Sequence, residues 1–359
     1  MSLLLWRSIT QWVGGIGIIL MAVAVLPYLK VGGMRLFKTE SSERAQLDSG
    51  HIYKAAKYIS LTYFTITLLC YLVYLILGMD WFDALNHSLS TVSTGGYSTH
   101  DQSFGFYQQP SMLIAASIFM ILGAFPFFLY IKSIKHRSND VFRDVQVRLF
   151  LKLILVMVTL VCVARLLSPH SENAWLIVAN SAFNIVSVIT TTGYASQDYS
   201  TWGSFSLLIF AFLTFSGACS GSTSGGIKLF RFQLLYIYVK EHLVSAVHPK
   251  CIQSREYNHR PVSEEVLVSS LAFLFFVMLS WFVCTMLLAA CGLDPVTAIS
   301  GALTALMNVG PGFGDTIGPG GNFSSLPTPA KYILCGAMWL GRLEYLTLVV
   351  IFSREFWKW

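Results

Sequence analysis

Long apolar stretches recur along this chain and constrain its fold more than any other feature. A stretch of about 18 or more mainly apolar residues can cross a bilayer as a helix. Hydrophobic residues make up 55% of the 359 positions and charged residues 12%, whereas soluble domains carry about 25% charged residues. The sequence therefore predicts an all-α integral membrane protein. Its expected spanning segments are 3–29, 54–78, 111–134, 146–167, 204–238, 264–291 and 330–353.

Most lysine and arginine residues gather in alternate loops, which predicts the orientation of the spans. They gather in 30–57, 132–152 and 228–260, and they are absent from 79–110, 166–205 and 292–330. The positive-inside rule assigns the basic loops to the cytoplasm and the other three to the outside. Residues 1–29 are then expected to run from outside to inside, although Arg7 followed by an apolar run also fits a signal peptide.

Sequence motifs for enzymatic chemistry or for a bound cofactor do not emerge. The seven cysteines form no CxxC pair and have no histidine at metal-ligand spacing. The interval from Gly221 to Lys228 is one residue too long for the phosphate-binding motif GxxxxGKS/T, and Leu229 follows the lysine. We therefore expect a protein that is not an enzyme, binds no cofactor and has no nucleic-acid partner.

Three loops on the non-basic side repeat one pattern. They read STVSTGG at 90–96, SVITTTG at 187–193 and TALMNVG at 304–310. In each, a hydroxyl residue lies six positions before the last glycine, and an aspartate (Asp101, Asp198 or Asp315) lies five positions after it. A short apolar stretch, too short to span, precedes each loop: 82–91, 174–189 and 296–307. The predicted unit is a spanning helix, a half-helix, a glycine loop and a second spanning helix, repeated three times.

Such loops have a specific use inside a membrane. Non-helical backbone is tolerated at membrane depth where it is buried in protein or lines a water-filled path, and carbonyl oxygens can then replace the hydration shell of a cation. The C-terminus of a half-helix adds a partial negative charge. The alternative is that these loops are ordinary surface turns. The three aspartates are expected to cap the loops rather than to bind an ion.

At these residues the chain resembles the Trk/Ktr/HKT superfamily of potassium transporters, specifically the TrkH-type potassium uptake membrane subunit. The motifs that carry the resemblance are STGGYS at 93–98, TTTGYA at 190–195, NVGPG at 308–312, GACSGSTSGGIK at 217–228 and GRLE at 341–344. The resemblance implies four non-identical helix–pore loop–helix units around a pseudo-fourfold pore. It also implies that K⁺ binds at a selectivity filter formed by Thr94, Gly95, Gly96, Thr191, Thr192, Gly193, Asn308, Val309 and Gly310.

The resemblance also implies a division of the chain. Segment 3–29 resembles the closing helix of a first unit whose filter loop is absent, so an N-terminally incomplete member is expected. The expected domains are 1–50, with that helix and a cytoplasmic loop; 51–137, a second unit; 138–260, a third unit with a broken second helix; and 261–359, a fourth unit.

The span 204–238 is interrupted by a run rich in glycine and serine at 215–228. Each glycine costs a helix interior about 1 kcal/mol relative to alanine, so the run predicts an intramembrane gating loop; the alternative is a packing patch of small residues. Arg342 lies in an apolar span, and the resemblance implies that it faces the pore and holds the loop closed. The alternative is an Arg342–Glu344 or Arg–backbone pair that only braces packing. The predicted gate residues are Gly217, Ser220, Gly221, Ser222, Thr223, Ser224, Gly225, Gly226, Lys228 and Arg342.

The expected function is potassium uptake across the cytoplasmic (inner) membrane by a multi-pass protein, with sodium as the alternative ion. The other candidates are a sodium- or proton-coupled potassium symporter and a non-conducting truncated membrane subunit. The resemblance implies a homodimer and a cytoplasmic nucleotide-binding regulatory ring of the TrkA type. The basic loops on which such a ring would dock also fit membrane lipid head groups.

Overall fold

The computed structural model describes residues 1–24, 49–136, 139–168, 173–249, 255–258, 260–343 and 357. This part of the chain is mostly helical, with a small antiparallel hairpin formed by β1 (Glu256–Tyr257) and β2 (Arg260–Pro261). The short connecting helices are η1 (Ser103–Phe106), α7 (Asp140–Arg143), η2 (Tyr199–Thr201), α14 (Gly314–Ile317) and η3 (Phe323–Ser325).

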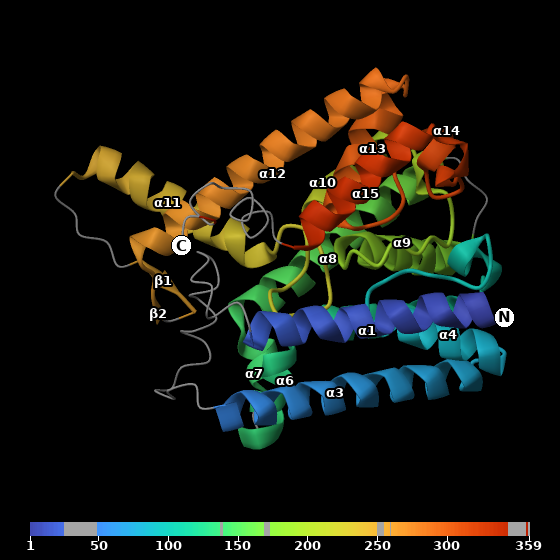
Figure 1. Cartoon of the computed structure of the whole chain (residues 1–359), viewed down its shortest axis with the longest axis horizontal. Coiled ribbons are helices and arrows are strands. Elements are labelled where there is room, and N and C mark those ends of the chain that lie inside the picture. The colour runs from blue at the N-terminus through green and yellow to red at the C-terminus, as the bar shows by residue number, and fades with distance from the viewer. Residues whose placement is uncertain are drawn as a thin grey trace.

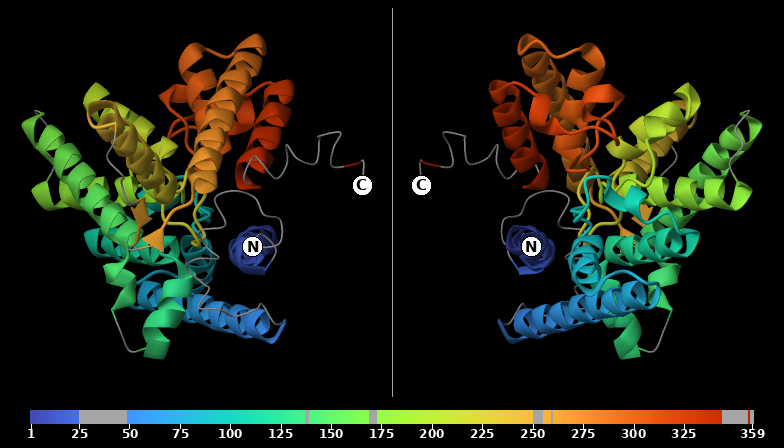
Figure 2. Two further views of the ribbon diagram at one scale, coloured as in Figure 1. Left: turned by 90° about the vertical axis from the view of Figure 1, so that its left-hand side faces the viewer. Right: turned by 90° about the vertical axis from the view of Figure 1, so that its right-hand side faces the viewer.

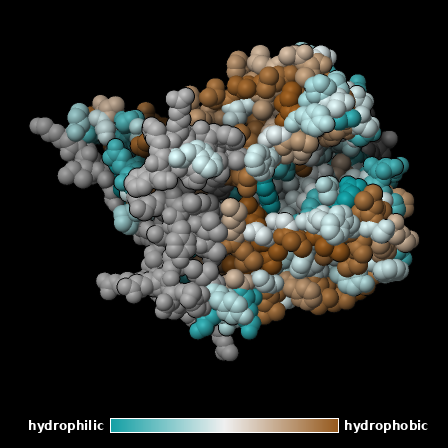
Figure 3. All heavy atoms as spheres, in the orientation of Figure 1, coloured by the Kyte–Doolittle hydropathy of each residue, from teal (hydrophilic) through white to brown (hydrophobic). Residues whose placement is uncertain are grey.

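Four of the described helices are long and apolar enough to cross a membrane. They are α1 (Ser2–Ala24), α3 (Ser49–Ile76), α8 (Val145–Leu167) and α12 (Glu264–Ala290). Their outward faces carry large apolar side chains, such as Leu155 and Leu160 on α8, which are exposed. Figure 3 shows the resulting apolar bands along the helices. Such bands are typical of helices whose outer faces meet lipid.

The half-helices lie where the sequence predicts them. They are α4 (Trp81–Val92), α9 (Ala174–Ile189) and α13 (Pro295–Met307). Each begins at a side chain that accepts a hydrogen bond from the first turn: Asp80 from Phe82 N, Asn173 from Trp175 N and Asp294 from Thr297 N. Asp and Asn are preferred N-caps for this reason. Because each cap satisfies an otherwise orphaned N–H, it fixes where the half-helix starts.

Each half-helix packs against long helices of its own unit. Figure 1 shows α3, α4 and α1 side by side, with α12, α13 and α15 (Thr328–Arg342) grouped at the opposite side and α8 with α9 between them. Figure 2 shows these groups arranged around a shared centre. The repeat of helix, half-helix, loop and helix is confirmed in all three units, whereas the domain boundaries drawn from the sequence stay a prediction.

Two of the expected spans are broken. The span 204–238 is divided, as predicted, into α10 (Ser204–Phe215) and α11 (Leu229–Val247). The span 111–134 was expected to be continuous, and this prediction is wrong: α5 (Pro110–Ala124) and α6 (Phe127–His136) meet at an angle of 87°. Pro126 lacks an N–H and disfavours helical geometry at the residue before it, and Phe125 accordingly is extended. The expected span 330–353 is described as far as Leu343, so Glu344 lies outside the described residues.

Gly341 allows α15 to approach the end of α13 closely. A Cβ at this position would collide with the Leu306 carbonyl oxygen and lie 2.8 Å from Asn308 Nδ2. A Cβ at Gly336, on the same helix, would meet no atom within 4 Å. These two glycines therefore form a matched pair of sites, one crowded and one open.

We expect Gly341→Ala to lower the thermal unfolding temperature of the purified protein, because overpacking costs about 1–3 kcal/mol. Gly336→Ala should leave it unchanged or raise it, since alanine favours helix over glycine by about 1 kcal/mol. Thermal unfolding of both variants in detergent checks this. Equal melting temperatures for the two variants would contradict the close packing of α15 on α13.

Candidate functional site

The three half-helices end in the same backbone conformation. The residue two positions before the last glycine is left-handed in each loop, with φ +50° at Thr94, +56° at Thr191 and +56° at Asn308. The next N–H in each loop donates to the carbonyl five residues back: Gly95 to Ser90 (2.8 Å), Thr192 to Ser187 (2.8 Å) and Val309 to Thr304 (3.0 Å). This is the Schellman form of helix ending. The repeat seen in the sequence is therefore also a repeat of backbone geometry.

The hydroxyl residue six positions before the glycine anchors the loop that follows. Ser187 Oγ donates to Tyr194 O at 2.7 Å, and Thr304 Oγ1 accepts from Gly310 N at 2.9 Å. In the first loop, Ser90 Oγ donates instead to Gln11 Oε1 of α1 at 2.6 Å. The sequence repeat singled out this position, and the structure supplies its role.

The three loops meet at their glycines. A Cβ at Gly96 would collide with Thr192 O, and a Cβ at Gly193 would collide with Val309 O. A Cβ at Gly310 would lie 3.7 Å from the Gly193 Cα. The backbone at Gly96, Gly193 and Gly310 also has positive φ, at +79°, +82° and +120°. Only glycine combines this geometry with so close an approach. The carbonyl just before the key glycine thus faces the neighbouring loop in two of the three units.

The aspartates behind these glycines do not share one role. Asp198 Oδ1 accepts from Ser200 N at 2.9 Å and caps η2, as expected of a structural residue. Asp315 lies in the first turn of α14. Among the described residues, no group of three or more His, Cys, Asp or Glu side chains is arranged to hold a metal ion. Any cation held between the loops would therefore meet main-chain and hydroxyl oxygens.

The segment that interrupts the broken helix packs against the three glycine loops. We call residues 216–228, between α10 and α11, the mid-helix loop. Its two ends run parallel: Ser216 bridges Ile227, Gly217 N donates to Ile227 O at 2.7 Å, and Leu229 N donates to Ala218 O at 3.1 Å. Backbone at this depth needs internal partners, and the closed ends provide them.

The mid-helix loop touches all three units at residues that precede their glycines. Thr94 Oγ1 donates to Thr223 Oγ1 at 3.0 Å, and Gly225 N donates to Thr191 Oγ1 at 2.6 Å. A Cβ at Gly225 would lie 2.8 Å from Met307 O. Thr223 Oγ1 also lies 3.2 Å from Val92 O and 3.0 Å from Gly123 O. Thr94 and Thr191, the left-handed residues of the first two glycine loops, are therefore hydrogen-bonded directly to the mid-helix loop.

Contacts from α15, α8 and α6, together with two of its own side chains, fix the mid-helix loop. Arg342, in the last turn of α15, donates from Nη1 to Thr223 O at 3.2 Å. Lys228 Nζ donates to Ser224 O, and Ser222 Oγ donates to Cys219 O at 2.7 Å. Gln146 Oε1 of α8 accepts from Ser220 N at 3.0 Å, and Phe127 N at the start of α6 donates to Gly221 O at 3.0 Å. A Cβ at Gly226 would lie 3.1 Å from the Gly217 Cα. The structure thus brings every predicted gate residue into one cluster.

The start of α8 connects this cluster with the hairpin. Asp144 caps α8 through Oδ1, which accepts from Gln146 N at 2.8 Å, while Oδ2 accepts from Asn258 Nδ2 at 3.1 Å. Burial raises the pKa of the Asp144 carboxyl, and the hydrogen bonds from Val147 N and Gln146 N oppose this shift. Gln146 therefore lies between a capped helix end on one side and the mid-helix loop on the other.

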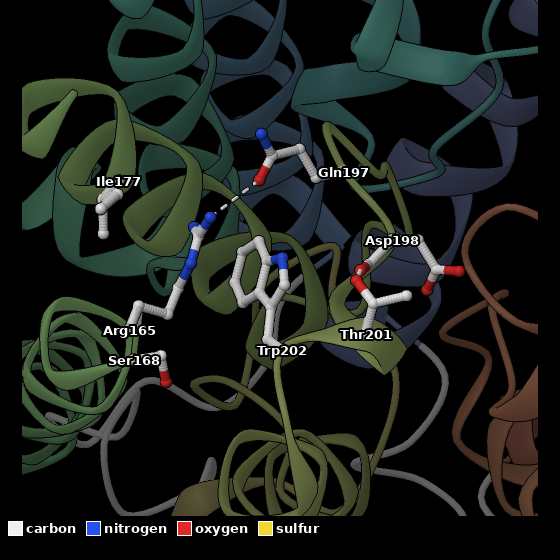
Figure 4. Close-up of a pocket in the computed structure, with 7 residues that line it drawn as sticks. All are labelled: Arg165, Ser168, Ile177, Gln197, Asp198, Thr201 and Trp202. Atoms are coloured by element: carbon white, nitrogen blue, oxygen red, sulfur yellow. Dashed lines mark hydrogen bonds between the residues drawn. The ribbon is translucent and has the colours of Figure 1, made fainter. Parts of the chain in front are cut away.

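A pocket of about 140 Å³ lies beside the second loop (Figure 4). Its Arg165 guanidinium stacks over the Trp202 ring at 3.9 Å and donates to Gln197 Oε1 at 3.1 Å. Arg165 also lies 3.4 Å from Ser181 Oγ of α9. These contacts tie the outer part of the second loop to α8 and α9. The pocket is lined by Arg165, Ser168, Ile177, Gln197, Asp198, Thr201 and Trp202.

Two contributors to the site carried little signal in the sequence, and a third carried one that was not used. Gln11 and Gln146 act from helices far away along the chain, and nothing local to them points to the loops. Tyr194 did carry a signal, because a tyrosine follows the key glycine in two of the loops. Its fully buried ring packs 4.6 Å from the ring of Phe104. Tyr194 thereby packs the second glycine loop against η1, the segment that follows the first glycine loop.

We expect Thr304→Val to lower the melting temperature, because it removes the acceptor of the Gly310 N–H, a hydrogen bond that contributes about 0.5–1.5 kcal/mol. Thr285→Val is the matched control, since the Thr285 hydroxyl has no partner among the described residues. Thermal unfolding of both variants distinguishes them. A melting temperature for Thr304→Val as high as that of the control would argue against the anchoring role.

Comparison with known proteins places this geometry in a family. The model of the TrkH family, described as "Cation transport protein", matches residues 1–358. The Trk system potassium uptake protein TrkI of Halomonas elongata is 44% identical, covering 99% of this chain and 72% of that protein. The Trk system potassium uptake protein TrkH of Escherichia coli K12 is 34% identical, covering 99% of this chain and 74% of that protein.

A solved structure agrees in fold. The crystal structure of the potassium transporter TrkH from Vibrio parahaemolyticus matches with a TM-score of 0.87 at 29% sequence identity, covering 99% of this chain and 73% of that one. Both the sequence and the three-dimensional arrangement are thus shared with these transport proteins. The chain belongs to the TrkH family of cation transport proteins.

Proposed function

We propose that this chain forms the ion pathway of a Trk-type potassium uptake system in the cytoplasmic membrane. The observation that carries the proposal is the meeting of three equivalent loops, in which the carbonyls before Gly193 and Gly310 turn toward the neighbouring loop. Family membership and the relatives, which are named as potassium uptake proteins, support the choice of ion.

The chemistry of the loops suits a cation that has lost its water. Main-chain oxygens can substitute for a hydration shell when they surround the ion at fixed positions, and the Schellman endings fix them. The half-helices also end at these loops, so each adds the partial negative charge of its C-terminus. We assign the ion-binding role to the loops at 94–96, 191–193 and 308–310.

We propose the mid-helix loop as the gate and its present arrangement as the closed state. It packs against the three loops and is held there by Thr94, Thr191 and Arg342. Opening requires that these hydrogen bonds break together. A guanidinium donor gives the strongest of them, since hydrogen bonds to charged groups contribute about 1.5–3 kcal/mol. Arg342 is therefore the proposed latch.

The same proposal includes assembly. A homodimer and a cytoplasmic nucleotide-binding regulatory ring would complete the system, with the basic segment 228–260 on the cytoplasmic side offering a docking surface. The connection from the hairpin through Asp144 and Gln146 to Ser220 supports this side as the one from which the gate is controlled.

We expect the protein to restore growth of uptake-deficient cells at low potassium, and Gly193→Ala to abolish this rescue. The added methyl group would collide with Val309 O. Gly203→Ala is the matched control, because Gly203 also has positive φ (+90°) but its Cβ would meet open space. Growth and ⁸⁶Rb⁺ uptake are the measurements. A Gly193→Ala variant that takes up as much ⁸⁶Rb⁺ as Gly203→Ala would exclude the loops as the ion site. Uptake by the wild type that requires added Na⁺ or a proton gradient would indicate a coupled symporter.

We expect Arg342→Ala to raise potassium leak through reconstituted protein roughly tenfold or more, because the closed state loses a charged hydrogen bond of about 1.5–3 kcal/mol. Arg148→Ala, at an exposed position on α8, should leave the leak at the wild-type level. Efflux of ⁸⁶Rb⁺ from proteoliposomes without nucleotide gives the comparison. Equal leak from both variants would reduce Arg342 to a packing brace.

A further inference from the structure

The first loop differs from the other two in how its anchoring hydroxyl is bonded. Ser187 and Thr304 make their hydrogen bonds within their own loops, to Tyr194 O and from Gly310 N. Ser90, at the equivalent position, donates to Gln11 Oε1 of α1. The first loop therefore takes from another helix a contact that the second and third loops make for themselves.

The Gln11 amide reaches both sides of Gly96. Its Oε1 accepts from Ser90 Oγ at 2.6 Å and lies 3.4 Å from Tyr97 N, which follows the glycine. Its Nε2 donates to the carbonyl of Gly95, which precedes the glycine. A Cβ at Gly95 would collide with the Gln11 amide carbon. One side chain thus fixes the orientation of the carbonyl on which the ion-binding role of the first loop depends.

The backbone that carries Gln11 is itself held in place. Trp12 Nε1 donates to Thr67 Oγ1 at 3.0 Å, and Tyr63 Oη donates to Trp12 O at 3.0 Å. A Cβ at Gly15 would lie 2.7 Å from Tyr63 Oη and 2.9 Å from Ser93 Cβ, so α1 packs directly on the end of α4. The amide is therefore presented from a fixed helix rather than from a mobile arm.

We propose that Gln11 is a positioning residue that determines cation selectivity through the first loop. The inference rests on the proposed transport function and extends it to a residue outside the loops. A carbonyl oxygen has two lone pairs, so Gly95 O can accept from Gln11 and still face a cation. The amide sets the angle of that carbonyl and withdraws some of its negative charge. Without it, the loop can adapt to a smaller ion.

Two substitutions separate the parts of this role. Gln11→Leu keeps the approximate size and removes every hydrogen bond, leaving Ser90 Oγ and Tyr97 N without their acceptor. Gln11→Glu keeps an acceptor for both but loses the donor to Gly95 O and sets a carboxylate beside it. Thr10→Ala is the control on the same helix, because the exposed Thr10 hydroxyl donates to the α1 carbonyls of Trp6 and Arg7.

The measurement is the ratio of ⁸⁶Rb⁺ to ²²Na⁺ uptake in cells that lack their own potassium uptake. Thr10→Ala should match the wild type, while both Gln11 variants should lower the ratio about three- to tenfold, the effect of one or two lost hydrogen bonds. Ser90→Ala, which removes the donor to Gln11 but leaves Gly95 bonded, should lower it less. This variant also decides the case if a Gln11 variant does not reach the membrane.

The outcomes distinguish the inference from the function beneath it. No uptake of either ion by the wild type would overturn the proposed function. Uptake by the wild type, with ratios for Gln11→Leu, Gln11→Glu and Ser90→Ala equal to that of Thr10→Ala, would overturn the inference and leave the function standing. A lowered ratio with unchanged thermal stability would support it, since a purely structural role would not move selectivity alone.

Discussion

The structure depends on one constraint: main-chain polar groups that leave a helix inside a membrane must find partners within the protein. The half-helices meet it with a left-handed residue and a hydrogen bond to the carbonyl five residues back, repeated at Ser90, Ser187 and Thr304. This ending satisfies the N–H groups of the turn and leaves the carbonyls that follow unused by secondary structure. The candidate ion site is formed by these carbonyls, which the helix endings leave outside the secondary-structure hydrogen bonds.

The same constraint accounts for the mid-helix loop. The loop satisfies part of its backbone at its closed ends, and other groups find partners in the surroundings: Gly225 N donates to Thr191 Oγ1, and the Thr223 side chain accepts from Thr94 Oγ1. Thr94 and Thr191, which end two of the half-helices, thereby bond directly to the mid-helix loop. A change in the loop must disturb the ends of the half-helices, which couples the proposed gate to the proposed filter without any intervening element.

Local pattern predicted most of the fold and of the site, whereas long-range contacts escaped it. The half-helices and their glycine loops recur as strings of fixed spacing, so their register could be read directly from 90–96, 187–193 and 304–310. The bend at Phe125 was missed because the segment is apolar throughout, and its length suggested one span although Pro126 marked the break. Gln11 was missed because its partners Ser90 and Gly95 lie on a different unit, and no spacing rule connects a glutamine on one helix with a loop so distant in the chain.

The sharp bend between α5 and α6 also has a use that a continuous helix could not provide. Within an unbroken helix every N–H is already engaged with the turn before it, whereas the first N–H groups of a new helix are unclaimed. By starting afresh at Phe127, the chain creates a spare donor in the protein interior, and Gly221 O accepts it. A kink that looks like a defect in a membrane span is thus the source of an anchoring point, placed where the neighbouring irregular segment has a carbonyl to satisfy.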